Sequence, residues 1–162
     1  MKKIYSVTVE NRAGVLMKVA GLFSRRNFNI DSLVVGETNV SDVSCMTIVS
    51  SGDARTIEQI EKQLNKKLDV IKVKTFREEE AVDRELMLVK VKYNKSNRRD
   101  IMENCDICGA TIVDMSKSFM MIQICDTTEK VELFLEVLKG ISIVEVARTG
   151  TVALQKCREN ER

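Results

Sequence analysis

The chain has 162 residues, of which 44% are hydrophobic, 31% charged and 4% aromatic, and its formal net charge is +2. This composition is typical of a globular protein with an aliphatic core, and the length suits one ordinary domain or two small ones. The small net charge argues against nucleic acid or an anionic membrane as the main partner. No apolar run reaches the ~20 residues that span a bilayer, and the N-terminal segment alternates instead of forming a signal core. We therefore expect a cytoplasmic protein.

Histidine is absent from the sequence, which removes the commonest general base and the commonest metal ligand. The number of cysteines, five, is odd, and their spacing does not match a disulfide framework. Both features are typical of free thiols in a reducing compartment. Acidic residues are dispersed, so no acid/base pair can be named. The sequence predicts neither a catalytic site nor a metal site.

Hydrophobic periodicity predicts the order βαββαβ in the first half of the chain. The expected elements are strands over residues 3–9, 30–40, 43–50 and 70–76, a helix from Gly14, and a helix capped by Asp53. The apolar stripe of the second helix is expected to contain Ile57, Ile60, Leu64 and Leu68.

The charged run from Arg77 to Glu85 is expected to be a solvated connector, after which the same order is repeated. The expected elements are strands over residues 86–93, 110–116, 118–125 and 142–148, a helix capped by Ser96 that runs to about Cys105, and a helix from Asp126 to Gly140. Repeated split βαβ units predict an α+β fold of two ferredoxin-like domains, over residues 1–78 and 84–158. Because such small cores are marginal, we also expect an oligomer.

Cys105 and Cys108 form a C-x-x-C pair, which elsewhere marks a metal site or a redox centre. No second pair is present to complete a zinc site, and the pair falls at the expected end of a helix rather than at its start. The two cysteines share a helical face with Ile101. This pattern favours buried or partly buried thiols.

Lysines alternate with apolar residues over residues 70–76 and 86–93, a pattern that also occurs in RNA-binding sheets. Such sheets stack bases on aromatic side chains, and here only Phe76 and Tyr93 are near. The lysines are better explained as the solvated side of the strands.

The strongest candidate for a binding site is the strand-to-helix loop from Asn11 to Leu16. Gly14 opens a helix whose unpaired backbone N–H groups are ready to receive a carboxylate. Asn11 is placed to meet an ammonium group or to cap the helix, and Val15 and Leu16 would line a small apolar pocket. The loop therefore fits an amino acid, although a simple cap and turn would have the same residues.

The stretch NRAGVLMKVAGLFSRRNFNIDSLVVGET, from Asn11 to Thr38, resembles the start of the ACT domain in the small, regulatory subunit of acetohydroxyacid (acetolactate) synthase. RELMLVKV and IVEVARTGTVAL, from Arg84 and from Ile143, resemble later segments of the same family. The resemblance extends over nearly the whole chain.

The resemblance implies a non-catalytic chain that activates a separate catalytic subunit and confers feedback inhibition by valine or another branched-chain amino acid. The catalytic partner is expected to carry thiamine diphosphate, Mg²⁺ and FAD, and the C-terminal domain is expected to contact it. Two ACT domains are expected to pair, with the effector between them. The implied effector-binding residues are Asn11, Arg12, Ala13, Gly14, Val15 and Leu16 of one chain and Asn29 and Ile30 of the other.

A stand-alone ACT-type sensor of a transcription factor or of another enzyme is the alternative. It would share the segment from Asn11 to Ile30 but lack VEVARTG, which is present here from Val144 to Gly150. An enzyme in its own right is disfavoured by the absence of histidine.

Overall fold

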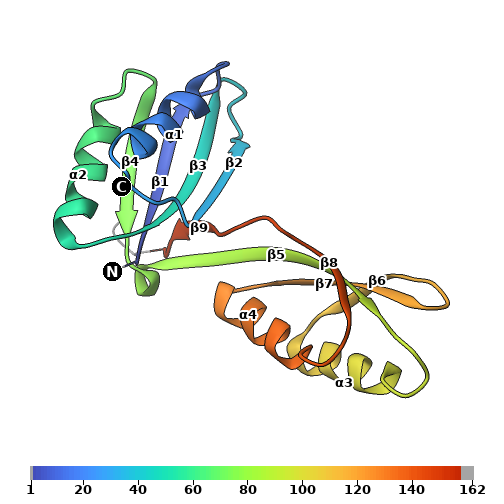
Figure 1. Cartoon of the computed structure of the whole chain (residues 1–162). Helices are drawn as coiled ribbons and strands as arrows, with labels where there is room; N and C mark the ends of the chain where they lie inside the picture. Colours follow the sequence, from blue (N-terminus) through green and yellow to red (C-terminus); the bar gives the residue numbers. More distant parts are fainter. Residues whose placement is uncertain (1, 158–162) are drawn as a thin grey trace. The chain divides into compact units, whose positions relative to one another are not determined.

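The computed structural model describes residues 2–157, which form two compact units (Figure 1). The first unit contains residues 2–82 together with the described residues from Thr151 onward, and the second contains residues 83–150. Each unit has an antiparallel sheet and two helices, so the predicted α+β fold of two ferredoxin-like units is confirmed.

The first unit has the order βαββαβ. Its elements are β1 (Lys2–Glu10), α1 (Val15–Arg25), β2 (Ser32–Glu37), β3 (Val43–Ser51), α2 (Ala54–Asn65) and β4 (Val70–Phe76). The strands are arranged in the order β2-β3-β1-β4. Tyr5, Val7 and Val9 of β1 are fully buried against apolar residues of both helices, as the strand's period of two predicts.

The other face of this sheet carries a smaller apolar cluster of Ile4, Val49, Phe76, Ala81 and Ala153. Ala81 begins the long strand β5 (Ala81–Lys92), and Ala153 lies on the short strand β9 (Val152–Gln155), which pairs with β5. Strand β9 was not expected from the sequence. The second domain was predicted over residues 84–158, but the described residues from Thr151 onward belong to the first unit.

The second unit repeats the same topology. After β5 come α3 (Arg98–Cys108), β6 (Thr111–Met115), β7 (Phe119–Asp126), α4 (Thr128–Val137) and β8 (Ile143–Arg148). The strands are arranged in the order β6-β7-β5-β8. Met87, Val89 and Val91 of β5 are fully buried beneath apolar residues of α3 and α4.

Three local predictions were wrong. The charged run after Arg77 is a connector only as far as the 3-10 turn Glu78–Glu80, since β5 begins at Ala81. Leu68 is 98% exposed because α2 ends at Asn65, before the stripe reaches it. Asn97, not Ser96, is the N-cap of α3. The Asn94 side chain accepts hydrogen bonds from the backbone N–H groups of Ser96 and Asn97, and these bonds fix the turn before the helix.

The thiols of the C-x-x-C pair are buried at Cys105 and half-buried at Cys108, as predicted. Both lie in the last turn and a half of α3, and the helix is closed by Gly109 in the left-handed conformation. No helix within residues 2–157 is long and apolar enough to cross a membrane.

Candidate functional site

The loop between β1 and α1 is held by backbone hydrogen bonds to two other segments of the first unit. The N–H of Asn11 donates to the carbonyl of Asp42 at 2.8 Å, and that of Glu10 donates to the carbonyl of Asp69 at 3.0 Å. Lys18 of α1 donates to the Asp69 carboxylate at 2.7 Å, and this hydrogen bond holds the pKa of Asp69 below its usual range. The loop is therefore a fixed feature of the fold.

Gly14 is the N-cap of α1 and has a φ of +85°, a conformation that favours glycine. No side chain caps this helix start. Val15 donates its N–H to the Arg12 carbonyl at 3.3 Å, and the first regular helical bond runs from Lys18 to Gly14. Over the described chain, the N–H groups of residues 13, 14, 16 and 17 have no acceptor. Unpaired donors at the positive end of a helix attract a carboxylate.

The side chain of Asn11 has a defined orientation. Its amide nitrogen donates to the carboxylate of Glu37 at 3.0 Å and to the carbonyl of Ser41 at 2.9 Å. Both of its donor positions are therefore used, which leaves the amide oxygen to accept a hydrogen bond. An ammonium group needs such an acceptor, so the structure favours that role for Asn11 over capping of α1.

A hollow of 320 Å³ lies beside the loop and is lined by Glu10, Asn11, Arg12 and Asp42. Arg12 forms an exposed ion pair with Glu10, with 3.3 Å between Nη1 and Oε2. The hollow thus has both signs of charge, which match the two charged ends of a free amino acid. The space around Gly14 is also open, since a Cβ placed there would meet no atom within 4 Å.

The apolar residues of the predicted site differ in their accessibility. Val15 is only 2% exposed and belongs to the core beneath the helix, so its side chain does not face a ligand. Leu16 and Met17 are 44% and 79% exposed. These two residues form an apolar surface beside the loop, available to a ligand or to a neighbouring chain.

Asn29 and Ile30 lie in the connection from α1 to β2. The Asn29 side chain donates to the Asp31 carboxylate at 2.6 Å, and the backbone carbonyl of Asn29 accepts from the hydroxyl of Ser50 at 2.6 Å. Ile30 is half-buried against the core. These contacts place the segment beside the C-terminal end of β3.

The two halves of the predicted site are at opposite ends of one sheet. In the register of β1 and β3, Glu10 lies opposite Val43, whereas Lys3 lies opposite Ser50. Val43 and Ser50 are seven residue steps apart along β3, a distance of roughly 23 Å. A single chain therefore brings residues 11–16 together and keeps Asn29 and Ile30 away from them.

Sequence reasoning missed Glu37 and Asp42, which lie close to Asn11 in the structure. They come from the hairpin of β2 and β3, some 26 and 31 residues further along the chain. No local pattern marks them, because their proximity depends on strand pairing.

Comparison with known proteins agrees with this architecture. Residues 5–72 match a family described as an "AHAS small subunit-like ACT domain", and residues 84–157 match one described as "Small subunit of acetolactate synthase". The chain is 44% identical over 154 residues to the probable acetolactate synthase small subunit of Methanothermobacter thermautotrophicus, covering 94% of this chain and 92% of the relative. This chain belongs to the family of acetolactate synthase small subunits.

Two further relatives support the same family assignment. The isozyme 3 small subunit of Escherichia coli K12 is 41% identical over 157 residues, which is 96% of each chain. The crystal structure of the small subunit from Thermotoga maritima superposes with a TM-score of 0.91 at 38% identity and covers 98% of this chain and 99% of that one. A small subunit with an ACT domain over the predicted site supports a regulatory role.

Proposed function

We propose that this small subunit activates the catalytic subunit of acetolactate synthase and makes it sensitive to feedback inhibition by a branched-chain amino acid, with valine as the first choice. The observation that carries the proposal is the loop from Asn11 to Leu16, where open helix N–H groups, a free amide oxygen and a hollow with both charges lie together. The family match over residues 5–72 and 84–157 favours a subunit over a stand-alone sensor.

In the proposed complex the effector carboxylate binds the N–H groups at the start of α1. Its ammonium group binds the Asn11 amide oxygen, with Asp42 adding negative charge. Its aliphatic side chain packs on Leu16 and on the Ile30 of a second copy of the chain. The separation of the two half-sites within one chain supports this pairing of two copies, because neither half alone surrounds a ligand.

The proposed mechanism is thermodynamic linkage. An effector that binds one arrangement of the paired chains more tightly shifts the complex toward it by its difference in affinity for the two states, typically ~1–3 kcal/mol. Catalysis remains on the partner, which would hold thiamine diphosphate, Mg²⁺ and FAD. Binding of the effector to the small subunit selects between the active and the inhibited state of the complex.

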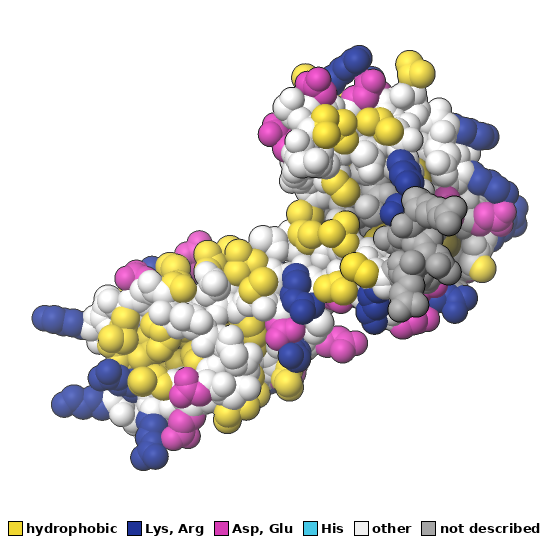
Figure 2. Space-filling model, turned by 180° about the vertical axis from the view of Figure 1, so that it is seen from behind, with side chains coloured by type: hydrophobic (Ala, Val, Ile, Leu, Met, Phe, Trp, Pro, Cys, Tyr) yellow, Lys and Arg dark blue, Asp and Glu magenta, His cyan; other side chains and the backbone are white. Residues whose placement is uncertain are grey.

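We assign contact with the catalytic subunit to the second unit. Because Met87, Val89 and Val91 face the helices, Leu86, Leu88 and Lys90 face the other side of the sheet. In the pairing with β7 this open face also carries Met121 and Phe119, and the Lys90 ammonium lies 5.5 Å from the Phe119 ring centre. Figure 2 shows hydrophobic side chains gathered on the surface of this unit. A sheet covered on one side only has a face available to a partner.

The proposed effector site is tested by Gly14→Asp, with Gly14→Ala as the matched control. Both variants strain the left-handed backbone, but only the aspartate brings a negative charge to the place of the ligand carboxylate. Calorimetric titration with valine, leucine and isoleucine, with and without the catalytic subunit, should show binding to the wild type and to Gly14→Ala and none to Gly14→Asp. Unchanged inhibition of the Gly14→Asp holoenzyme would disprove the site.

A further inference from the structure

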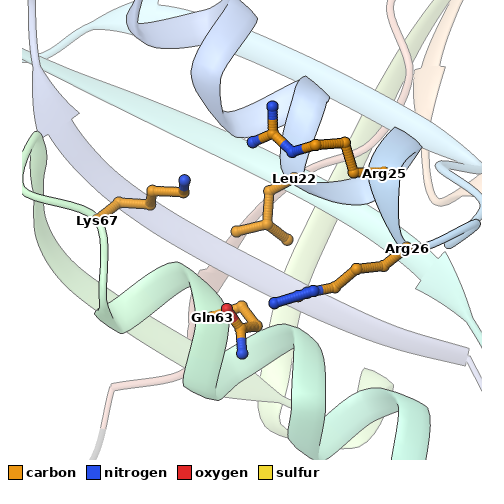
Figure 3. A pocket seen from close by; sticks show the side chains of 5 residues that line it. All are labelled: Leu22, Arg25, Arg26, Gln63 and Lys67. Atoms are coloured by element: carbon orange, nitrogen blue, oxygen red, sulfur yellow. The ribbon is translucent and has the colours of Figure 1, made fainter.

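A second hollow of the first unit, distinct from the proposed effector loop, lies between the ends of α1 and α2 (Figure 3). Its volume is 440 Å³, within the range of small-molecule sites. Its lining is formed by Leu22, Arg25, Arg26, Gln63 and Lys67. Leu22 is 3% exposed and forms an apolar floor, and the cationic side chains extend over it from both helix ends.

The positive charges around this hollow are not compensated by the protein. Within the described chain, neither Arg25, Arg26 nor Lys67 forms an ion pair, and no acidic residue lines the hollow. Two other cations on the same two helices do have partners. Lys18 binds Asp69, and Lys62 binds Glu58.

The acidic residues of α2 are directed elsewhere. Glu58 is occupied by Lys62, and Glu61 accepts a hydrogen bond from Thr75 of β4 at 3.3 Å. The three cations therefore repel one another across the hollow. A bound anion would remove that repulsion and add charge-assisted hydrogen bonds.

A basic residue at the end of a helix also has a simpler explanation, since it stabilises the negative end of the helix dipole. Arg25 and Arg26, in the last turn and at the C-cap of α1, fit that role. Lys67, directly after the C-cap of α2, fits the same role for its own helix. The dipoles do not account for the convergence of the three cations and the Gln63 amide on one hollow. The two helix ends contribute roughly half a negative charge each, about one in all, against three positive charges, so the hollow keeps a net positive charge.

We propose that this hollow binds a small phosphate-type oxyanion with two or more negative charges. The planar guanidinium groups of Arg25 and Arg26 match phosphate oxygens in pairs, the Lys67 ammonium adds a point charge, and the Gln63 amide adds a donor. Leu22 gives an apolar contact to any organic part of the ligand. A half-open hollow of 440 Å³ between two helices has room for a small ligand.

Inorganic pyrophosphate is the probe that tests this site on the full-length chain. Isothermal titration at constant ionic strength, with chloride as the replaced anion, should give saturable binding of one pyrophosphate per chain. Arg26→Gln, Arg25→Gln and Lys67→Gln should each weaken it by about tenfold or more, because each removes a charge-assisted hydrogen bond. All three side chains are at the surface, and thermal unfolding in chloride checks that each variant is folded.

Lys66→Gln is the matched control. Lys66 is exposed, adjacent to Lys67 in sequence, and absent from the lining of the hollow, yet its replacement changes the net charge equally. Pyrophosphate affinity should change less than about twofold in this variant. The proposal is overturned if pyrophosphate does not saturate, or if Lys66→Gln weakens binding as much as Arg26→Gln. It is also overturned if the arginine variants only weaken association with the catalytic subunit, which would indicate an acidic protein surface as the ligand.

Discussion

Arg148 of β8 forms a bidentate ion pair with Glu85 of β5, with 2.6 Å from Nε to Oε1 and 3.1 Å from Nη2 to Oε2. The Glu85 side chain is only 3% exposed, and the third guanidinium nitrogen donates to Glu132 of α4 at 2.6 Å. One guanidinium therefore joins two strands and a helix of the second unit. These hydrogen bonds raise the pKa of Arg148 further above its usual range.

Arg148→Ala should destabilise the second unit by about 3 kcal/mol, because it leaves the Glu85 carboxylate buried without its partner. Thermal or urea unfolding of the full chain measures this loss. Arg99→Ala is the control, since Arg99 forms an exposed pair with Glu103 and should cost less than about 1 kcal/mol. Adding Glu85→Gln to Arg148→Ala should recover part of the loss. Equal effects of the two alanine variants would contradict this account.

The same pair explains why the start of β5 was mistaken for a connector. The run after Arg77 contains glutamates and an aspartate that look solvated when read locally. Glu85 is buried only because Arg148 lies beside it, 63 residues further along the chain. Strand β9 was missed for a related reason. Its four residues are stabilised as a strand by pairing with β5 and by the packing of Ala153 with Ile4 and Phe76. Pairings of this kind have no local signal.

The regular elements were more predictable. Strand β4 has the predicted bounds, because its limits are set by the end of one amphipathic pattern and the start of a charged run. Asp53 caps α2 by accepting from the Thr56 N–H at 2.7 Å, as its position before an apolar stripe indicated. At the candidate site Asn11 and Gly14 were predicted from local chemistry, whereas Glu37 and Asp42 required the fold.

Tyr5 predicts a loss of stability in alkaline solution. Burial, with a smaller contribution from Glu61, raises the pKa of Tyr5 from 10.0 to about 12. Because the folded state prefers the neutral phenol, its stabilising contribution is complete below pH 10 and is lost as the pH rises through 12. The loss amounts to about 2–3 kcal/mol. Urea unfolding at pH 8 to 11 should show that the free energy of unfolding of Tyr5→Phe rises relative to that of the wild type above pH 10. A constant difference between the two proteins over this pH range would contradict the prediction.

Cys105, which is buried, should be the least reactive thiol of the described chain. Burial raises its pKa from 9.0 to about 11, so its thiolate fraction at pH 8 falls about a hundredfold. Cys125 is exposed. Alkylation with iodoacetamide, followed by mass spectrometry, should modify Cys125 about a hundredfold faster or more. Rapid joint modification of Cys105 and Cys108, or stoichiometric zinc binding by them, would instead indicate a functional C-x-x-C pair.

The two-chain effector site predicts complementation between two defective variants. Asn11→Ala removes the oxygen proposed to bind the ammonium, and Asn29→Ala alters the half-site at the opposite end of β3. Each variant alone should bind the effector poorly, because every site would contain one defect. In a mixed pair, one site carries both substitutions and the other carries none. An equal mixture, unfolded together and refolded, should therefore regain about a quarter of the wild-type sites, since half of the pairs are mixed and each has one intact site of two. Calorimetric stoichiometry measures this fraction. No recovery in a mixture shown to contain mixed pairs would mean that the two asparagines do not act across one interface.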